Sequence, residues 1–245
     1  MTEPLGFTST TIQRLRRLHG RRSSRSEEGA FVVEGPVLVA EAVAAGWEIE
    51  GQFVAPGASP VDGAGPVRSL APGVAERIAA TETTPGLFAV VRARTVDVSV
   101  LDEAGFVVVA DRIADPGNLG TILRSAEASG VDAVVLTPGS VDVLNPKVVR
   151  ASAGALFHVP VAVGGLRDVR AAGLRIVGTS SHHGSPHTAA DWTGRTAIVL
   201  GNEAHGLGDE APVDEWVRIE HRGRAESLNV AMAATILCFE AARSR

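Results

Sequence analysis

Hydrophobic positions in the first hundred residues form short clusters separated by polar turns, a pattern that predicts a small α/β unit. Ile12, Leu15 and Leu18 recur at helical spacing with arginines between them, which indicates an amphipathic helix over 10–19 with one basic face. The arginine- and serine-rich stretch 20–28 is expected to be a mobile linker. Further strands are predicted at 30–33, 49–55, around Val67 and at 87–91, with helices at 37–45 and 74–80 and a loop over most of 56–72.

The pattern changes after residue 100 to long runs of β-branched residues that are apolar on both faces. Such runs are typical of parallel strands covered by helices on both sides. Glycine or threonine closes several runs, and the carboxyl ends of strands are where open α/β sheets bind ligands. Strands are predicted at 106–110, 131–136, 157–161, 174–178, 197–200 and 216–219, with helices at 118–129 and 145–155.

The last predicted helix, within 230–242, is apolar almost all round. Such a helix has to be buried on more than one side. We therefore expect it to pack on its own sheet and to present Met232, Ile236 and Phe239 to a second copy of the chain. Cys238, the single cysteine, lies in this helix and is expected to be a small buried hydrophobe.

Composition narrows the class of protein. The 245 residues are 45% hydrophobic and 21% charged, which is ordinary for a globular protein, and the length favours two domains. The sequence has no apolar run of about 18 residues and no apolar signal-peptide core, which predicts a soluble, cytoplasmic protein without a membrane segment. Lys147 is the only lysine, so a phosphate-binding loop ending in Gly-Lys-Ser/Thr is excluded.

Charge is distributed unevenly along the chain. The net charge of −5 argues against nucleic-acid binding by the protein as a whole. The N-terminal arm, residues 1–26, is nevertheless basic, since its only acid is Glu3. A charge run of this kind is usually a solvated tail, and RNA contact becomes the favoured interpretation only when other motifs point to RNA. The arm carries six arginines, namely Arg14, Arg16, Arg17, Arg21, Arg22 and Arg25.

Three turns that lead into predicted helices carry polar residues that no fold requires. They span Asp115 to Arg124, Val199 to Leu207 and Glu226 to Val230. In this order and spacing they resemble the three sequence motifs of the SpoU (TrmH-like) RNA 2′-O-methyltransferases of the SPOUT superfamily. One such segment alone would be a weak match, but three in order make a specific one. The element order around Phe31-Val32-Val33-Glu34-Gly35 is similar to the small RNA-binding domain that precedes the catalytic domain in many members.

The resemblance implies a fold and a domain organisation. It implies an α/β domain over 101–245, with a parallel sheet whose C-terminal part is threaded into a trefoil knot, and a homodimer formed through this knot domain. It also implies a substrate RNA-binding α/β domain over 27–96, preceded by the basic arm. A Gly-x-Gly-x-x-Gly sequence does not follow the strand at 106–110, so an ordinary dinucleotide-binding fold is not expected. The methyl donor, S-adenosylmethionine, is instead expected in the knot.

The resemblance also assigns roles to five motif residues. Arg124 is matched to the ribose 2′-OH, either as the base of the family's usual account or as an electrostatic stabiliser of the developing alkoxide, since a guanidinium is ordinarily a fixed cation. Asn118 either caps a helix or orients Arg124 and the ribose. Glu203 either anchors Arg124 by a bidentate pair or stabilises a helix start. Ser227 and Asn229 would touch the ribose, Arg124 or the amino-acid end of the cofactor.

The adenine of the cofactor is expected between main-chain groups at strand ends and in the third motif, where glycine permits close approach. Two places depart from many relatives, Glu220-His221 after the last strand and Ala204-His205 after Glu203, and they put the local pocket and the target preference in question. The cofactor-binding residues implied are Thr179, Leu200, Gly201, Ile219 and Leu228.

Three histidines, His182, His183 and His187, are interpreted as part of a polar loop near the cofactor. Gly184 and Pro186 break any helix that would align them, so no metal site is expected.

These features together predict an S-adenosylmethionine-dependent methyltransferase that modifies a ribose 2′-OH in RNA, with rRNA favoured. One alternative is a tRNA 2′-O-methyltransferase. Another is a non-catalytic RNA-binding or ribosome-assembly factor with the same fold, which would have lost motif residues, whereas all five are present. A small-molecule or protein methyltransferase would leave the basic arm unexplained.

Overall fold

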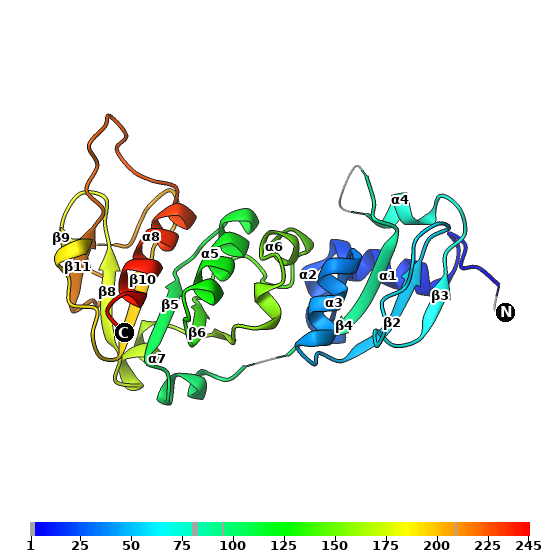
Figure 1. Ribbon diagram of the computed structural model, residues 1–245, viewed down its shortest axis with the longest axis horizontal. Helices are drawn as coiled ribbons and strands as arrows, with labels where there is room; N and C mark the ends of the chain where they lie inside the picture. The colour runs from blue at the N-terminus through cyan, green and yellow to red at the C-terminus, as the bar shows by residue number, and fades with distance from the viewer. Residues whose placement is uncertain (1–2, 80–82, 95, 209) are drawn as a thin grey trace. The chain divides into compact units, whose positions relative to one another are not determined.

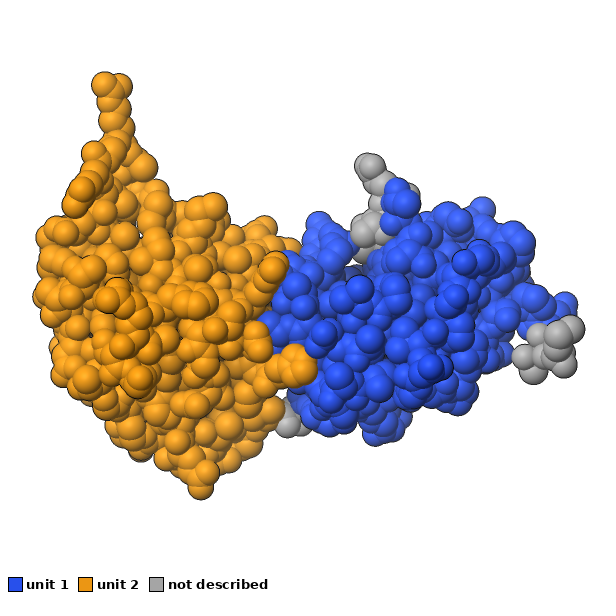
Figure 2. Space-filling model, viewed as in Figure 1, with its two compact units in different colours: residues 1–94, 142–157 blue, residues 95–141, 158–245 orange. Residues whose placement is uncertain are grey.

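The computed structural model describes residues 3–79, 83–94, 96–208 and 210–245, which form two compact units (Figures 1 and 2). Unit 1 comprises Met1–Arg94 and Asp142–Phe157, and unit 2 comprises Thr95–Val141 and His158–Arg245. The second segment of unit 1 therefore interrupts the stretch 101–245, which the sequence treats as one domain.

Unit 1 is a four-stranded sheet with helices, in the strand order β1-β4-β2-β3 (Figure 1). Strand β4 runs antiparallel to β1 and β2, whereas β2 and β3 are parallel. The predicted small α/β unit is confirmed. Its elements are α1 (Thr10–Gly20), α2 (Arg22–Glu28), β1 (Ala30–Glu34), α3 (Pro36–Ala44), β2 (Ile49–Val54), β3 (Val67–Ser69), α4 (Val74–Ile78), β4 (Leu87–Arg92), α6 (Pro146–Ala151) and the 3-10 turn η2 (Ala155–Phe157).

The basic arm is a folded part of unit 1. Helix α1 buries Ile12, Leu15 and Leu18 in the core, as its periodicity predicts. The expected mobile linker at 20–28 is wrong, because α2 forms there and ends at Gly29 in the left-handed conformation with φ of 59°. Helix α4 ends at Ile78, two residues before the predicted end at Ala80, which lies outside the described residues.

An aromatic cluster and the ion pair between Arg25 and Asp142 hold the segment 142–157 in unit 1. The indole of Trp47 packs edge-on against Phe157 with ring centroids 5.3 Å apart, and its N–H donates to the Phe157 carbonyl at 3.0 Å. Phe31 stacks on Phe157 and also contacts Trp47 edge-on, with ring centroids 6.5 and 6.0 Å apart. The strand predicted at 157–161 is therefore wrong, since Phe157 ends a 3-10 turn and the strand begins only at Val161.

Unit 2 contains a seven-stranded sheet in the order β7-β6-β5-β10-β8-β11-β9 (Figure 1). Its paired strands are all parallel among the described residues, which confirms the predicted parallel sheet. Its elements are η1 (Val98–Asp102), β5 (Phe106–Ala110), α5 (Pro116–Ala128), β6 (Ala133–Leu136), β7 (Val161–Val163), α7 (Leu166–Ala171), β8 (Arg175–Thr179), β9 (Ser185–Pro186), η3 (His187–Ala189), β10 (Thr196–Leu200), β11 (Glu215–Arg218) and α8 (Val230–Ala242).

Helices α5 and α8 pack side by side, so the first and third motifs come together in space (Figure 1). The hydroxyls of Ser125 and Thr235 share a hydrogen bond of 2.7 Å between the two helices. Cys238 is fully buried on α8, and burial raises the pKa of its thiol to about 12, which confirms its role as a small hydrophobe. No helix in the described part of the chain is long and apolar enough to cross a membrane.

Candidate active site

A cavity of about 640 Å³ opens in unit 2 where β8, β10 and β11 end and where α8 begins. This is the edge at which open α/β sheets bind ligands, and its volume lies within the range of about 300–1,000 Å³ for small-molecule sites. Nine of the ten predicted catalytic and cofactor residues line it. They are Asn118, Thr179, Leu200, Gly201, Glu203, Ile219, Ser227, Leu228 and Asn229.

Hydrogen bonds join one residue from each of the three motifs. The side-chain amide of Asn229 donates to the Asn118 carbonyl oxygen at 2.9 Å, and the Asn118 amide donates to a carboxylate oxygen of Glu203 at 3.0 Å. Each asparagine uses its donor and acceptor in a defined direction, so the chain of contacts fixes both amides. The Glu203–Asn118–Asn229 relay is therefore the framework that holds the three turns together.

Glu203 also binds the main chain of the first motif. Its carboxylate accepts from the backbone N–H groups of Ala114 and Asp115, both at 3.1 Å. Partial burial alone would raise the pKa of Glu203, but the hydrogen bonds from Asn118 and the backbone outweigh it and lower the pKa below its usual 4.5. The suggested bidentate pair between Glu203 and Arg124 does not occur among the described residues, because the carboxylate is occupied by these donors.

Helix α5 begins with Asp115, not with Asn118. The Asp115 carboxylate accepts from the backbone N–H of Asn118 at 2.8 Å, and Pro116 occupies the first helical position. The capping role considered for Asn118 is therefore wrong. Because Asp115 caps the helix, the Asn118 side chain is available for the relay. Aspartate directly before proline is itself a helix-start signal, which sequence reasoning overlooked.

Asn229 has two roles at once. Its side-chain oxygen accepts from the backbone N–H groups of Ala231 at 2.9 Å and Met232 at 3.3 Å, so it caps α8, while its amide nitrogen enters the relay. The helix start and the motif contact thus depend on the same side chain. Ser227 is exposed at the cavity.

Asn202 shapes the turn of the second motif and was not predicted as a site residue. Its amide donates to the Arg112 carbonyl at 2.8 Å, and its oxygen accepts from the backbone N–H of Ala204 at 2.9 Å. Gly201 precedes it, and the chain turns back at residues 206 and 207 to pack against Gly201. A Cβ at Gly201 would lie 2.4 Å from backbone atoms of residues 206 and 207, so only glycine fits there. The signal for Asn202 was its place between Gly201 and Glu203 in the motif.

Arg124 is exposed on α5 and does not line the cavity. It lies six residues beyond Asn118, which corresponds to about 9 Å along a helix. It makes no hydrogen bond or ion pair within the residues that the structure describes. No carboxylate among the described residues therefore neutralises its charge.

Histidines form part of the cavity wall. His182 and His183, predicted to lie in a polar loop, both line it, together with His205 and His221. The His183 ring packs on Trp216 with centroids 4.7 Å apart, and its Nδ1 lies 3.0 Å from the Ser180 hydroxyl. In the described residues, no group of three histidine, cysteine or acidic side chains is placed to hold a metal ion.

The six arginines predicted to bind RNA differ in their surroundings within unit 1. Arg16, Arg17, Arg21 and Arg22 are exposed, and Arg14 is half-buried among carboxylates. Arg25 is only 4% exposed and donates to Asp142 and to the Leu18 carbonyl. A guanidinium enclosed in this way cannot reach a phosphate, so the assignment of Arg25 to RNA is corrected to a structural role.

Comparisons with known proteins show which family the chain resembles. Residues 105–239 match the SpoU rRNA Methylase family, and residues 9–89 match the MRM3-like substrate binding domain. The 23S rRNA (uridine(2479)-2′-O)-methyltransferase of Streptomyces viridochromogenes is 33% identical over 96% of this chain and 90% of its own length. The 23S rRNA (guanosine(2553)-2′-O)-methyltransferase RlmP of Bacillus subtilis is 39% identical over 54% of this chain and 56% of its own length.

Solved structures resemble the whole chain. The AdoMet-bound rRNA methyltransferase from Sinorhizobium meliloti has a TM-score of 0.86 at 29% identity and covers 99% of this chain and 97% of its own. The SpoU methyltransferase AviRb from Streptomyces viridochromogenes, in complex with AdoMet, has a TM-score of 0.85 at 30% identity over 96% of this chain and 97% of its own. With its three motifs joined at one cavity, the chain belongs to the SpoU rRNA Methylase family.

Proposed function

We propose that this protein transfers the methyl group of S-adenosylmethionine to a ribose 2′-OH in ribosomal RNA. The observation that carries the proposal is the relay of Glu203, Asn118 and Asn229 beside the cavity that contains the five expected cofactor positions. The names of the relatives favour rRNA over tRNA as the substrate.

The cavity residues fit the cofactor. Leu200, Ile219 and Leu228 supply an apolar lining for a flat base, and Gly201 lines the cavity beside them without a side chain. When bound, the cofactor supplies an electrophilic methyl group. The relay then keeps the loops of all three motifs in one arrangement, so that the ribose hydroxyl is positioned by a rigid site.

The chemical task left to the protein is the proton of the 2′-OH, which is a very weak acid. Loss of the O–H proton places negative charge on the ribose oxygen, whose electron pair would form the new C–O bond while the S–CH3 bond breaks and its electron pair stays on sulfur, leaving S-adenosylhomocysteine. We assign Arg124 to the stabilisation of this charge, because a guanidinium stays protonated and the Arg124 side chain is exposed without an internal partner among the described residues. Water or an RNA phosphate would accept the proton.

We further propose a homodimer and a cytoplasmic location. The exposed fractions of Met232, Ile236 and Phe239 on α8 are 62%, 39% and 46%, which is unusual for three large apolar side chains on one helix. A second copy of the same helix would cover them. The cytoplasm follows from the proposed rRNA substrate. Unit 1 is assigned the selection of that RNA, in accord with its match to a substrate binding domain.

The test is a calorimetric titration of S-adenosylmethionine into the wild type, Arg124→Ala and Arg167→Ala, paired with radiolabelled methyl transfer to bulk rRNA and bulk tRNA. Arg167 is an exposed arginine on α7 and serves as the matched control. All three proteins are expected to bind the cofactor, and only Arg124→Ala is expected to lose labelling of rRNA, by about 10²–10³-fold.

Two results would contradict the proposal. Labelling confined to the tRNA pool would change the substrate class. A wild type that binds no cofactor would leave an RNA-binding assembly factor as the better description.

A further inference from the structure

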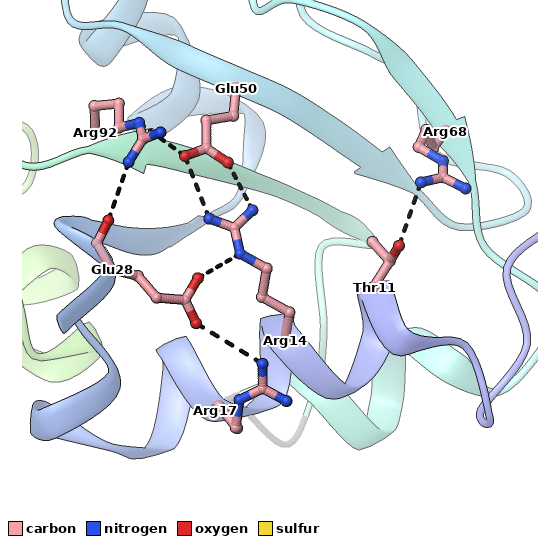
Figure 3. Close-up of polar contacts among 7 residues, drawn as sticks. All are labelled: Thr11, Arg14, Arg17, Glu28, Glu50, Arg68 and Arg92. Carbon is pink, nitrogen blue, oxygen red and sulfur yellow. Dashed lines mark hydrogen bonds and ion pairs between the residues drawn. The ribbon is translucent and has the colours of Figure 1, made fainter.

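Unit 1 contains a second hollow, of about 440 Å³, bounded by α1, β2 and β3. Two kinds of residues line it. Its apolar floor is formed by the buried Phe53 and Val90, whereas its polar lining comprises the hydroxyl-bearing start of α1, Glu50, Arg14, Arg17 and Arg68. Figure 3 shows Thr11 and Arg68 facing each other, with Arg14 and Arg17 on the same helix as Thr11.

Arginines of the unit neutralise two carboxylates, that of Glu50 in the lining of the hollow and that of Glu28 beside it. Arg14 donates to both oxygens of Glu50, at 2.6 and 3.3 Å, and its Nε lies 2.5 Å from Glu28 (Figure 3). Arg92 adds a second ion pair to Glu50 at 2.9 Å. The hydrogen bonds from Arg14 keep the pKa of Glu50 below its usual range, so this carboxylate stays charged and matched. Both carboxylates are paired with arginines, which reduces their repulsion of a bound anion.

The guanidinium groups of Arg17 and Arg68 make only long contacts with other described residues, so they can still bind a ligand. The Arg17 side chain is 46% exposed, and its ion pair with Glu28 is long, at 3.8 Å. Arg68 is exposed and donates to the Thr11 hydroxyl at 3.3 Å, and it forms no ion pair in the part of the chain that the structure describes. Four arginines against two glutamates leave two positive charges here, on a chain whose net charge is −5.

We propose that this hollow binds one nucleotide unit of the RNA substrate, with one flanking phosphate at Arg17, another at Arg68 and the nucleoside over the apolar floor. Guanidinium groups bind phosphate oxygens through paired donors, and RNA recognition commonly combines such contacts with an unstacked base on an apolar surface. The hollow has the size of a small-molecule site. This inference rests on the proposed function, and it places the RNA contact on the α1–β3 face instead of spreading it along all six arginines of the arm.

The experiment compares full-length Arg17→Ala, Arg68→Ala and their double variant with Arg77→Ala and Arg150→Ala. The two controls are exposed arginines of α4 and α6 that do not line the hollow and are not among the arginines predicted to bind RNA. Binding of transcribed 23S rRNA is measured by fluorescence anisotropy at several salt concentrations, with thermal melting and cofactor titration as checks of folding.

Each hollow variant is expected to lose about tenfold in RNA affinity and about 0.7–0.9 in the slope of log affinity against log salt, as for one phosphate contact. The KM for rRNA should rise accordingly, while the kcat at saturating rRNA and the cofactor affinity stay at wild-type values. Photocrosslinking of wild type to rRNA that contains 4-thiouridine should label peptides from α1 or β3.

A double variant that matches the two controls in affinity and salt slope would overturn the inference, as would crosslinks confined to other elements. An acidic partner protein would be indicated instead if poly-glutamate bound the wild type through Arg17 and Arg68 while RNA affinity did not depend on them. The proposed function fails separately, if the wild type labels no rRNA at all.

Discussion

The side-chain amide of Asn229 donates to the carbonyl oxygen of Asn118 at 2.9 Å, across 111 residues of sequence. The Asn118 amide in turn donates to Glu203, and Asn229 also caps α8. These connected hydrogen bonds therefore couple the starts of two helices to the turn after β10. Local helix capping and the geometry of the active site are thus the same set of contacts.

The relay predicts that Asn118→Asp is more harmful than the loss of one hydrogen bond. An aspartate would place a second carboxylate against Glu203 and could not donate to it. Because a small misplacement of reacting groups is costly, we expect methyl transfer to rRNA to fall about 10²-fold. Thr121→Ala is the control, since it removes a hydroxyl on the exposed side of the same helix. Wild-type kcat in Asn118→Asp would show that the relay does not position the site.

Glu203 makes the stability of unit 2 depend on pH. Its pKa in the folded protein is lower than 4.5, so its contribution to the free energy of unfolding is present above pH 4.5 and is lost as the pH falls through the lowered pKa. Glu203→Gln should therefore melt at a lower temperature than the wild type at pH 7, and the difference should shrink below about pH 4.

Thermal melts between pH 7 and pH 3 measure this difference, with Glu127→Gln, an exposed change on α5, as the control. A gap between Glu203→Gln and the wild type that stays constant down to pH 3 would exclude ionised Glu203 as its source.

Arg25 is expected to stabilise unit 1. Its guanidinium lies 2.6 Å from Asp142, and the side chains of the pair are 4% and 15% exposed. Removal of one member of a buried pair leaves the other charge uncompensated and costs about 3–5 kcal/mol. Arg25→Ala should lose about that much in urea unfolding, whereas Arg22→Ala, one turn earlier on the exposed side of α2, should change stability by less than about 0.5 kcal/mol. Unchanged stability with weakened rRNA binding would restore Arg25 to the RNA-binding set.

The same ion pair explains one limit of prediction from sequence. The pattern of α1 was sufficient because its three apolar residues recur at helical spacing. Helix α2 has no such stripe. Its burial depends on Arg25 meeting Asp142, which lies 117 residues away, and no local pattern records that contact. Phe157 was assigned to a strand for a similar reason, since its apolar character serves the cluster with Phe31 and Trp47.

The candidate site shows the complementary limit. Motif spacing identified Asn118, Glu203 and Asn229, and the cavity unites them. Their partners were not predictable, because Glu203 was expected either to pair with Arg124 or to stabilise a helix start and instead binds Asn118 and backbone N–H groups. Side-chain pairing depends on loop geometry, which periodicity does not encode. The threading of a knot leaves no mark in hydrophobic periodicity either.

The exposed face of α8 leads to a prediction about assembly. Met232, Ile236 and Phe239 lie on a helix whose opposite side packs into unit 2 through Ala234 and Leu237. If a second copy covers this face, a charge placed at its centre would be buried without a partner, which a dimer does not tolerate. Ile236→Glu should therefore have the mass of one chain in light scattering, while the wild type has the mass of two. Val163→Glu is the control, because it introduces the same charge at an exposed position of β7 and should leave the dimer intact. A wild type that is monomeric at micromolar concentration would contradict the proposed dimer. An Ile236→Glu protein that remains dimeric would place the interface on another surface.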